Sequence, residues 1–192
     1  MRQIIFGALL LAALGSFSWT LSRLVRFLWR GRPTTTPFGE KPARAGDVLS
    51  FFFMQRTVAR EAASWHHLLI FWGFLILTVG TAEMILNGLM PRFSFALLGT
   101  GFDHGFKAVL DVTNAVVLAV ILFAYFRRIV LRPPLIPLSG DAALILGMIA
   151  TLCVTHFIMH GAEFIVAQDP PTWMPVSAMV GAWLGSLAGA TA

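Results

Sequence analysis

The stretch Trp65–Leu89, WHHLLIFWGFLILTVGTAEMILNGL, decides the fold of this chain. Its side chains are almost all apolar. At about 1.5 Å per helical residue, it is long enough to cross a bilayer core of about 30 Å. Three more apolar runs of similar length lie before and after it, at residues 4–28, 106–126 and 142–167. We therefore predict an all-α, polytopic transmembrane helix bundle with four visible spans.

The composition supports this prediction. Of the 192 residues, 57% are hydrophobic and only 12% are charged, about half the charged fraction of a typical soluble domain. This excludes a soluble globular domain. The net charge of +5 could suggest nucleic acid, but the basic residues flank the apolar runs, so no nucleic-acid partner is expected. The single cysteine, Cys153, lies inside an apolar run, so the sequence offers no disulfide framework and no iron–sulfur cysteine motif.

The basic residues predict the orientation of the spans. Of the 14 Lys and Arg residues, most lie between the first two spans or between the third and fourth: Arg23, Arg26, Arg30, Arg32, Lys41, Arg44, Arg56, Arg60, Arg127, Arg128 and Arg132. The opposite side holds only Arg2, Arg92 and Lys107. Because arginine-rich loops stay in the cytoplasm, we expect an external N-terminus in a bacterial-type inner membrane.

The sequence divides into four parts. Residues 1–30 are the first predicted transmembrane helix, and residues 31–63 form a cytoplasmic loop whose segment 47–60 (DVLSFFFMQRTVAR) should lie along the membrane interface. Residues 64–167 form a three-helix domain, and residues 168–192 an external segment that is not expected to span. Prolines mark the helix ends: Pro33, Pro37, Pro91, Pro133, Pro134 and Pro137. Ser139 or Asp141 can cap the last span.

Histidines inside the spans are candidate cofactor ligands, because ionisable groups are costly there. His66 and His67 open the second span, where a neutral imidazole could coordinate haem iron. The alternative is a histidine pair that contacts lipid headgroups. His156 and His160 are four residues apart and share one helix face. They could hold haem or another metal, or instead form hydrogen bonds within the bundle.

A second group of polar residues is predicted to form one layer near the outer ends of the helices: Glu83, His104, Lys107, Asp111, His160 and Glu163. Lys107 and Asp111 are four residues apart, so they can pair. Quinone chemistry needs such protonatable groups, which makes Lys107, Asp111 and Glu83 candidates for proton handling. The alternative is an interfacial salt-bridge network. Gly73 and Gly80 would allow the close approach of a helix or of a flat macrocycle.

Two segments resemble a known family. Residues 64–77 (SWHHLLIFWGFLIL) and 125–165 (YFRRIVLRPPLIPLSGDAALILGMIATLCVTHFIMHGAEFI) resemble the membrane domain of heterodisulfide-reductase-related iron–sulfur oxidoreductases. That domain is similar to the gamma (cytochrome b) subunit of respiratory nitrate reductase. The family's His-x-x-x-Phe-x-Gly-Phe pattern matches His67, Phe71, Gly73 and Phe74. Its Arg-Arg-x-x-x-Arg-Pro turn matches Arg127, Arg128, Arg132 and Pro133.

The resemblance implies five transmembrane helices, with haem b held by histidines of the second and fifth. His67, or less readily His66, would ligate the cytoplasmic-side haem, and its partner ligand would come from a fifth helix beyond this sequence. Leu77 stands where the nitrate-reductase branch has a further histidine, so an outer haem would need His156 or His160. Lys107 is comparable to a lysine near the quinone in that branch. The iron–sulfur clusters would belong to a partner or to a further domain.

Together these features predict a cytochrome b-type electron-transfer domain that links menaquinone or ubiquinone to a cytoplasmic iron–sulfur oxidoreductase. One alternative is a haem-free membrane anchor subunit of a respiratory complex. A small transporter, with a path through Glu83, Asp111 and Glu163, is disfavoured because the sequence lacks a pair of helices broken by Pro or Gly.

Overall fold

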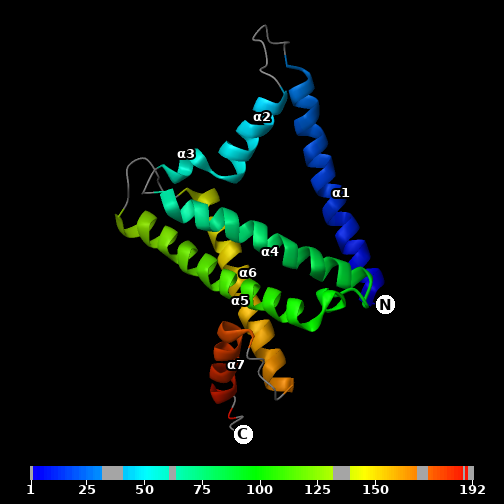
Figure 1. The fold of residues 1–192 in the computed structure, drawn as a ribbon. Helices are drawn as coiled ribbons and strands as arrows, with labels where there is room; N and C mark the ends of the chain where they lie inside the picture. The colour runs from blue at the N-terminus through cyan, green and yellow to red at the C-terminus, as the bar shows by residue number, and fades with distance from the viewer. Residues whose placement is uncertain are drawn as a thin grey trace. The chain divides into compact units, whose positions relative to one another are not determined.

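The computed structural model describes residues 2–31, 41–60, 64–131, 139–167, 173–187 and 189. Within these residues all regular structure is helical (Figure 1). Four long helices dominate: α1 (Arg2–Trp29), α4 (Trp65–Leu89), α5 (Thr100–Phe126) and α6 (Gly140–Ala167). Each is long and apolar enough to cross a membrane. The predicted all-α, multi-pass architecture with four spans is thereby confirmed.

The helix boundaries follow local signals in the sequence. α4 begins and ends where the apolar run does, and Pro91 follows its end. α5 begins at Thr100, six residues before the predicted apolar run, so the helix also includes the polar residues Asp103 and His104. The Ser139 hydroxyl accepts a hydrogen bond of 3.2 Å from the Ala142 N–H, which confirms Ser139 as a cap of α6. The other predicted breakers lie outside the described residues: Pro33, Pro37, Pro133, Pro134 and Pro137, together with Arg132.

Several shorter elements connect or follow the long helices. Before α4 lie α2 (Lys41–Asp47), a π-helical turn at Val48–Phe53 and α3 (Arg56–Ala59). A 3-10 turn, Phe95–Leu98, precedes α5, and a π-helical turn, Arg127–Leu131, continues it. The predicted interfacial segment therefore contains the first π-helical turn and α3, with Phe51, Phe52 and Phe53 all exposed. Its position along a membrane surface stays a prediction.

The chain forms two compact units. The first comprises Met1–Arg56 and Ala82–Ser94, and the second comprises Thr57–Thr81 and Phe95–Ala192. In the first unit, the ring of Phe6 fills the space beside Gly88, where an added Cβ would lie 2.6 Å from the Phe6 Cε1 atom. The absence of a side chain at Gly88 thus lets α1 approach the end of α4.

The core of the second unit lies between α4, α5 and α6. Its buried apolar residues are Val117, Ile121, Ala124, Leu146 and Cys153. Gly73 and Gly80 of α4 make room for α5, because a Cβ on them would lie 2.4 Å from Val117 Cγ2 and 2.7 Å from Leu110 Cδ1. The predicted close approach at these glycines is confirmed, and the partner is a helix. These two contacts also show that α4 and α5 run antiparallel.

The last described helix, α7 (Pro175–Leu187), has 13 residues and is too short to cross a bilayer core of about 30 Å. It packs on α6 through glycine backbones. A Cβ on Gly161 would lie 2.9 Å from the Gly181 nitrogen, and a Cβ on Gly181 would lie 2.9 Å from the Gly161 oxygen. Ser177, Gly181 and Gly185, spaced four residues apart, are all buried. Small residues at this spacing allow two helices to approach closely.

Candidate functional site

Asp111 of α5 is the most deeply buried charged residue described in the second unit, with no exposed surface. Its carboxylate receives hydrogen bonds from the start of α7. The Val176 N–H donates to Oδ2 over 2.7 Å, the Ser177 N–H to Oδ1 over 3.2 Å, and the Ser177 hydroxyl to Oδ1 over 2.5 Å. The first N–H groups of a helix have no partner within that helix. Asp111 therefore caps α7 from a neighbouring helix.

The predicted pairing of Lys107 with Asp111 is wrong. The Lys107 ammonium bonds instead to the Asp103 carboxylate, at 2.6 Å. The residues four before and four after Lys107 lie on the same helix face, so spacing alone permits either partner. The Asp111 carboxylate is bonded to the first turn of α7. Lys107 therefore bonds Asp103, which lies one turn before it on α5.

The histidines of α6 lie beside this buried carboxylate. The Nε2 atom of His156 is 3.9 Å from Asp111 Oδ1, which is beyond hydrogen-bond distance. The His156 and His160 rings meet edge to face, with centroids 4.6 Å apart. His160 Nδ1 lies 2.9 Å from Glu163 Oε2. The observed contacts of His160 match the second alternative, hydrogen bonding within the bundle, and ligation by either histidine stays a prediction.

The remaining members of the predicted outer layer have other contacts. The His104 ring stacks on Trp173, with centroids 3.7 Å apart and planes at 9°. Glu83 belongs to the first unit, where the Ser94 hydroxyl donates a hydrogen bond to it over 3.3 Å. The structure thus brings Asp111, His156, His160 and Glu163 together within the second unit, while the convergence of Glu83 with them stays a prediction.

The candidate haem ligands His66 and His67 lie at the start of α4. His66 is half-buried, and its ring packs against Trp65 and Phe123, with centroids 6.4 Å and 6.0 Å away. His67 is exposed and so is accessible to a flat cofactor or to another helix. Ligation of haem by His67 or His66 stays a prediction.

A second axial ligand would have to lie at the same level, because both axial nitrogens bind one iron atom. Asp111, which His156 faces, precedes Phe123 by about 12 residues, or about 18 Å along a helix. His156 is therefore too far along the bundle to share an iron with His67. Within the parts of the chain that the structure describes, no group of three or more His, Cys, Asp or Glu residues could hold a metal ion.

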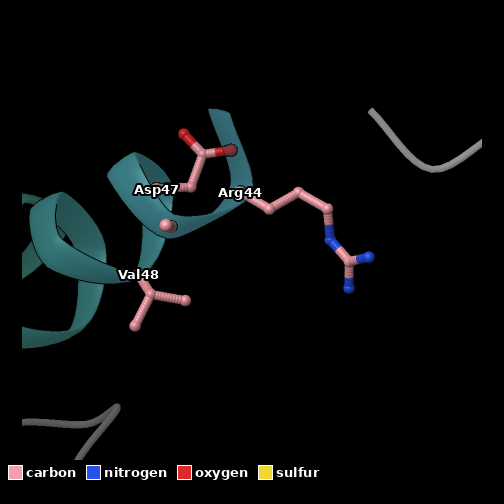
Figure 2. Close-up of a pocket in the computed structure, with 4 residues that line it drawn as sticks. Arg44, Asp47 and Val48 are labelled. Carbon is pink, nitrogen blue, oxygen red and sulfur yellow. The ribbon is translucent and has the colours of Figure 1, made fainter. Parts of the chain in front are cut away.

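The structure also has a shallow depression in the first unit, lined by Arg44, Ala45, Asp47 and Val48 (Figure 2). In Figure 2 the Arg44 side chain extends away from the helix, and the Asp47 and Val48 side chains point in other directions. The polar groups do not converge on one point, so this depression is a poor candidate for a ligand site.

Sequence reasoning missed the part of the site that comes from α7. Ser177 and Gly181 have no chemistry that marks them in an apolar stretch, yet one bonds Asp111 and the other contacts Gly161. The signal that could have found them is the Ser-x-x-x-Gly-x-x-x-Gly spacing that ends at Gly185. Such spacing of small residues is typical of a helix that packs closely on a neighbour.

Comparison with known proteins gives one informative similarity. The chain is 28% identical over 109 residues to EtfAB:quinone oxidoreductase of Syntrophomonas wolfei subsp. wolfei (strain DSM 2245B / Goettingen). The match covers 56% of this chain but only 15% of that protein. No protein-family model matches the chain, and no solved structure matches it. The chain is therefore weakly similar to a quinone-linked oxidoreductase of much greater length.

Proposed function

We propose that this chain is a membrane electron-transfer domain of cytochrome b type that connects menaquinone or ubiquinone with a cytoplasmic iron–sulfur oxidoreductase. The similarity to EtfAB:quinone oxidoreductase is the main support for the proposal. This chain has four helices that could span a membrane, and the protein that it is similar to is named for its reaction with quinone. The nitrate-reductase-like resemblance of the sequence points to the same chemistry.

The polar interior of the second unit supports a quinone site. Reduction of a quinone to a quinol takes up two protons with two electrons, so it requires protonatable side chains near the ring. Asp111 and His156 lie within 3.9 Å of each other inside the helix bundle. Lys107 lies one turn before Asp111 on α5. In this proposal Lys107 and Asp111 are the proton-handling residues of this site, and Glu83 of the first unit stays a separate candidate for proton handling.

His67 is the proposed axial ligand of haem b, with His66 as the less favoured choice. Its exposed imidazole is available without repacking of α4, and the second axial histidine would come from outside the described residues. When bound, haem b would carry one electron at a time between the quinone and the iron–sulfur partner.

Optical spectroscopy of the full-length protein tests this proposal. We expect a Soret band and a b-type reduced-minus-oxidised spectrum in the wild type, a loss of haem in His67→Ala, and retention of haem in the control His104→Phe. The control replaces a histidine that stacks on Trp173 and that we do not propose as a ligand. A colourless wild-type protein, purified after growth with ample iron and haem precursor, would overturn the haem assignment.

One observation favours a second candidate, a haem-free membrane anchor. The Asp111 carboxylate of α5 bonds the Ser177 hydroxyl of α7, which suits a group that locks helices together. In the anchor, His67→Ala would leave the activity of the partner subunit unchanged. In the electron-transfer domain, the same substitution would abolish electron transfer between quinone and partner.

A further inference from the structure

The titratable side chains near Asp111 lie in order of increasing exposure. The Asp111 side chain is 0% exposed and that of His156 is 19% exposed. The side chains of His160 and Glu163 are 24% and 60% exposed. A row of protonatable groups that leads from a fully buried carboxylate to the outer end of α6 is the arrangement that proton transfer through a bundle requires.

We propose that His156, His160 and Glu163 form a proton path into the second unit, with the buried Asp111 carboxylate at its inner end. That a quinone takes up the protons rests on the proposed function. The path itself rests on the geometry of α5 and α6.

The outer step of the path is a direct contact. Glu163 Oε2 lies 2.9 Å from His160 Nδ1, within hydrogen-bond distance. Because Glu163 is exposed, its carboxylate can exchange protons with water or with headgroup phosphates. It then passes a proton to the imidazole one helical turn away.

The middle step joins the two imidazoles. Their rings meet edge to face, with centroids 4.6 Å apart and planes at 70°. A neutral imidazole has one N–H donor and one acceptor nitrogen, so it can take a proton at one nitrogen and release one from the other. One bridging water or a ring rotation completes this step.

The inner step ends at His156. Its Nε2 atom is buried, has no hydrogen-bond partner among the described residues, and faces Asp111 Oδ1 at 3.9 Å. The helices packed against α6 are α5 and α7. α5 contributes Asp111 to this contact, and α7 has no titratable side chain. The Asp111 carboxylate therefore faces His156 across the helix interface, and its negative charge favours a protonated imidazole.

The chemistry balances with a quinone at the inner end. Reduction of the quinone takes two electrons from the redox centre of the iron–sulfur partner, and the two protons arrive one after the other through His156. Both quinone oxygens become hydroxyl groups. Oxidation of a quinol reverses every step, so the path serves either direction of electron flow.

Two measurements on the full-length protein in nanodiscs test the path. The first is the rate of duroquinol oxidation with a tetrazolium dye as the electron acceptor. His156→Asn should slow it by about 100-fold or more, in the range of general acid–base catalysis. Glu163→Gln should slow it by about tenfold, less than an inner relay residue because water partly replaces an exposed group. Millimolar azide, a small weak base, should restore part of that loss.

The matched control is Asp141→Asn, which removes an exposed carboxylate from the opposite end of the same helix and should leave the rate unchanged. The second measurement is the pH titration of the ¹⁵N-labelled histidine rings by NMR, which needs no quinone activity. In the path, Glu163→Gln and Asp111→Asn both shift the titration of His156 and His160, because coupled groups titrate together.

The outcomes separate the two proposals. A wild type that does not oxidise duroquinol, yet shows coupled titration of His156 and His160, would overturn the proposed function and leave the proton path standing. Histidines that titrate independently in every variant would overturn the path. Equal oxidation rates in wild type, Glu163→Gln and Asp141→Asn would also overturn the path while leaving quinone-linked electron transfer intact.

Discussion

The hydroxyl of Ser177 donates a hydrogen bond of 2.5 Å to Asp111 Oδ1, although the two residues are 66 positions apart in the sequence. This bond and those from the Val176 and Ser177 N–H groups tie α7 to α5. The same carboxylate lies 3.9 Å from His156 of α6. One buried side chain of α5 thus contacts two other helices, and its removal has consequences that a surface carboxylate would not have.

We expect Asp111→Ala to lower the free energy of unfolding by about 3 kcal/mol, because it leaves buried donors of α7 without acceptors. Ser177→Ala, which removes only one of these bonds, should cost about 1 kcal/mol. Both values are measured by detergent-induced unfolding in mixed micelles, with the exposed Asp141→Asn as the control. Equal stabilities of Asp111→Ala and Asp141→Asn would contradict the capping role.

Gly161 and Gly181 should not tolerate a side chain. A Cβ on either meets backbone atoms of the other at 2.9 Å, and backbone cannot rotate away as a side chain can. We expect Gly161→Ala and Gly181→Ala each to cost about 1–3 kcal/mol, the usual cost of overpacking. The control is Gly105→Ala on α5, where an added Cβ meets nothing within 4 Å. It should not destabilise, and a similar loss in all three variants would rule out close packing of α6 on α7.

A double-mutant cycle distinguishes the two possible partners of Lys107. Because Lys107 bonds Asp103, the pair Lys107→Met and Asp103→Asn should show a coupling energy of about 0.5–1 kcal/mol in unfolding experiments. Lys107→Met and Asp111→Asn should be additive to within about 0.5 kcal/mol. A coupling found only in the second pair would restore the pairing that the sequence suggested.

Reporter fusions test the orientation that the basic residues predict. Green fluorescent protein fused after Gly31 should fluoresce, because the loop rich in arginine is expected to be cytoplasmic. Alkaline phosphatase fused after Arg92 should be active, because the turn between α4 and α5 is expected to lie outside. The opposite pattern at both sites would invert the topology and place the Glu163 end of α6 in the cytoplasm.

The four spans could be predicted from the sequence because the membrane sets one simple requirement, a run of about 20 apolar residues. Trp65–Leu89 meets it with Glu83 as its one acidic residue, and the helix has those bounds. Two local features could also be predicted: Ser139 caps α6, and the absence of a side chain at Gly73 lets Val117 of α5 pack against α4. These signals depend on residues close in sequence or on the absence of a side chain.

The contacts of Asp111 could not be predicted, because they depend on where α7, about 66 residues later in the sequence, packs against α5. The spacing of Lys107 and Asp111 fits a pair as well as that of Asp103 and Lys107 does, and only the arrival of α7 decides between them. The closeness of His156 to Asp111 needs the register of α5 against α6, which buried apolar packing sets. A pattern within one helix contains no information about that register.

Because Asp111 caps α7, the helices must assemble in a certain order during membrane insertion. The N–H groups at the start of α7 find their acceptor only after α5 has been inserted, and Gly181 meets Gly161 only once α6 is in place. α7 can therefore dock only after α5 and α6 are in place. A substitution of Asp111 should appear first as degradation of newly made protein by membrane quality-control proteases.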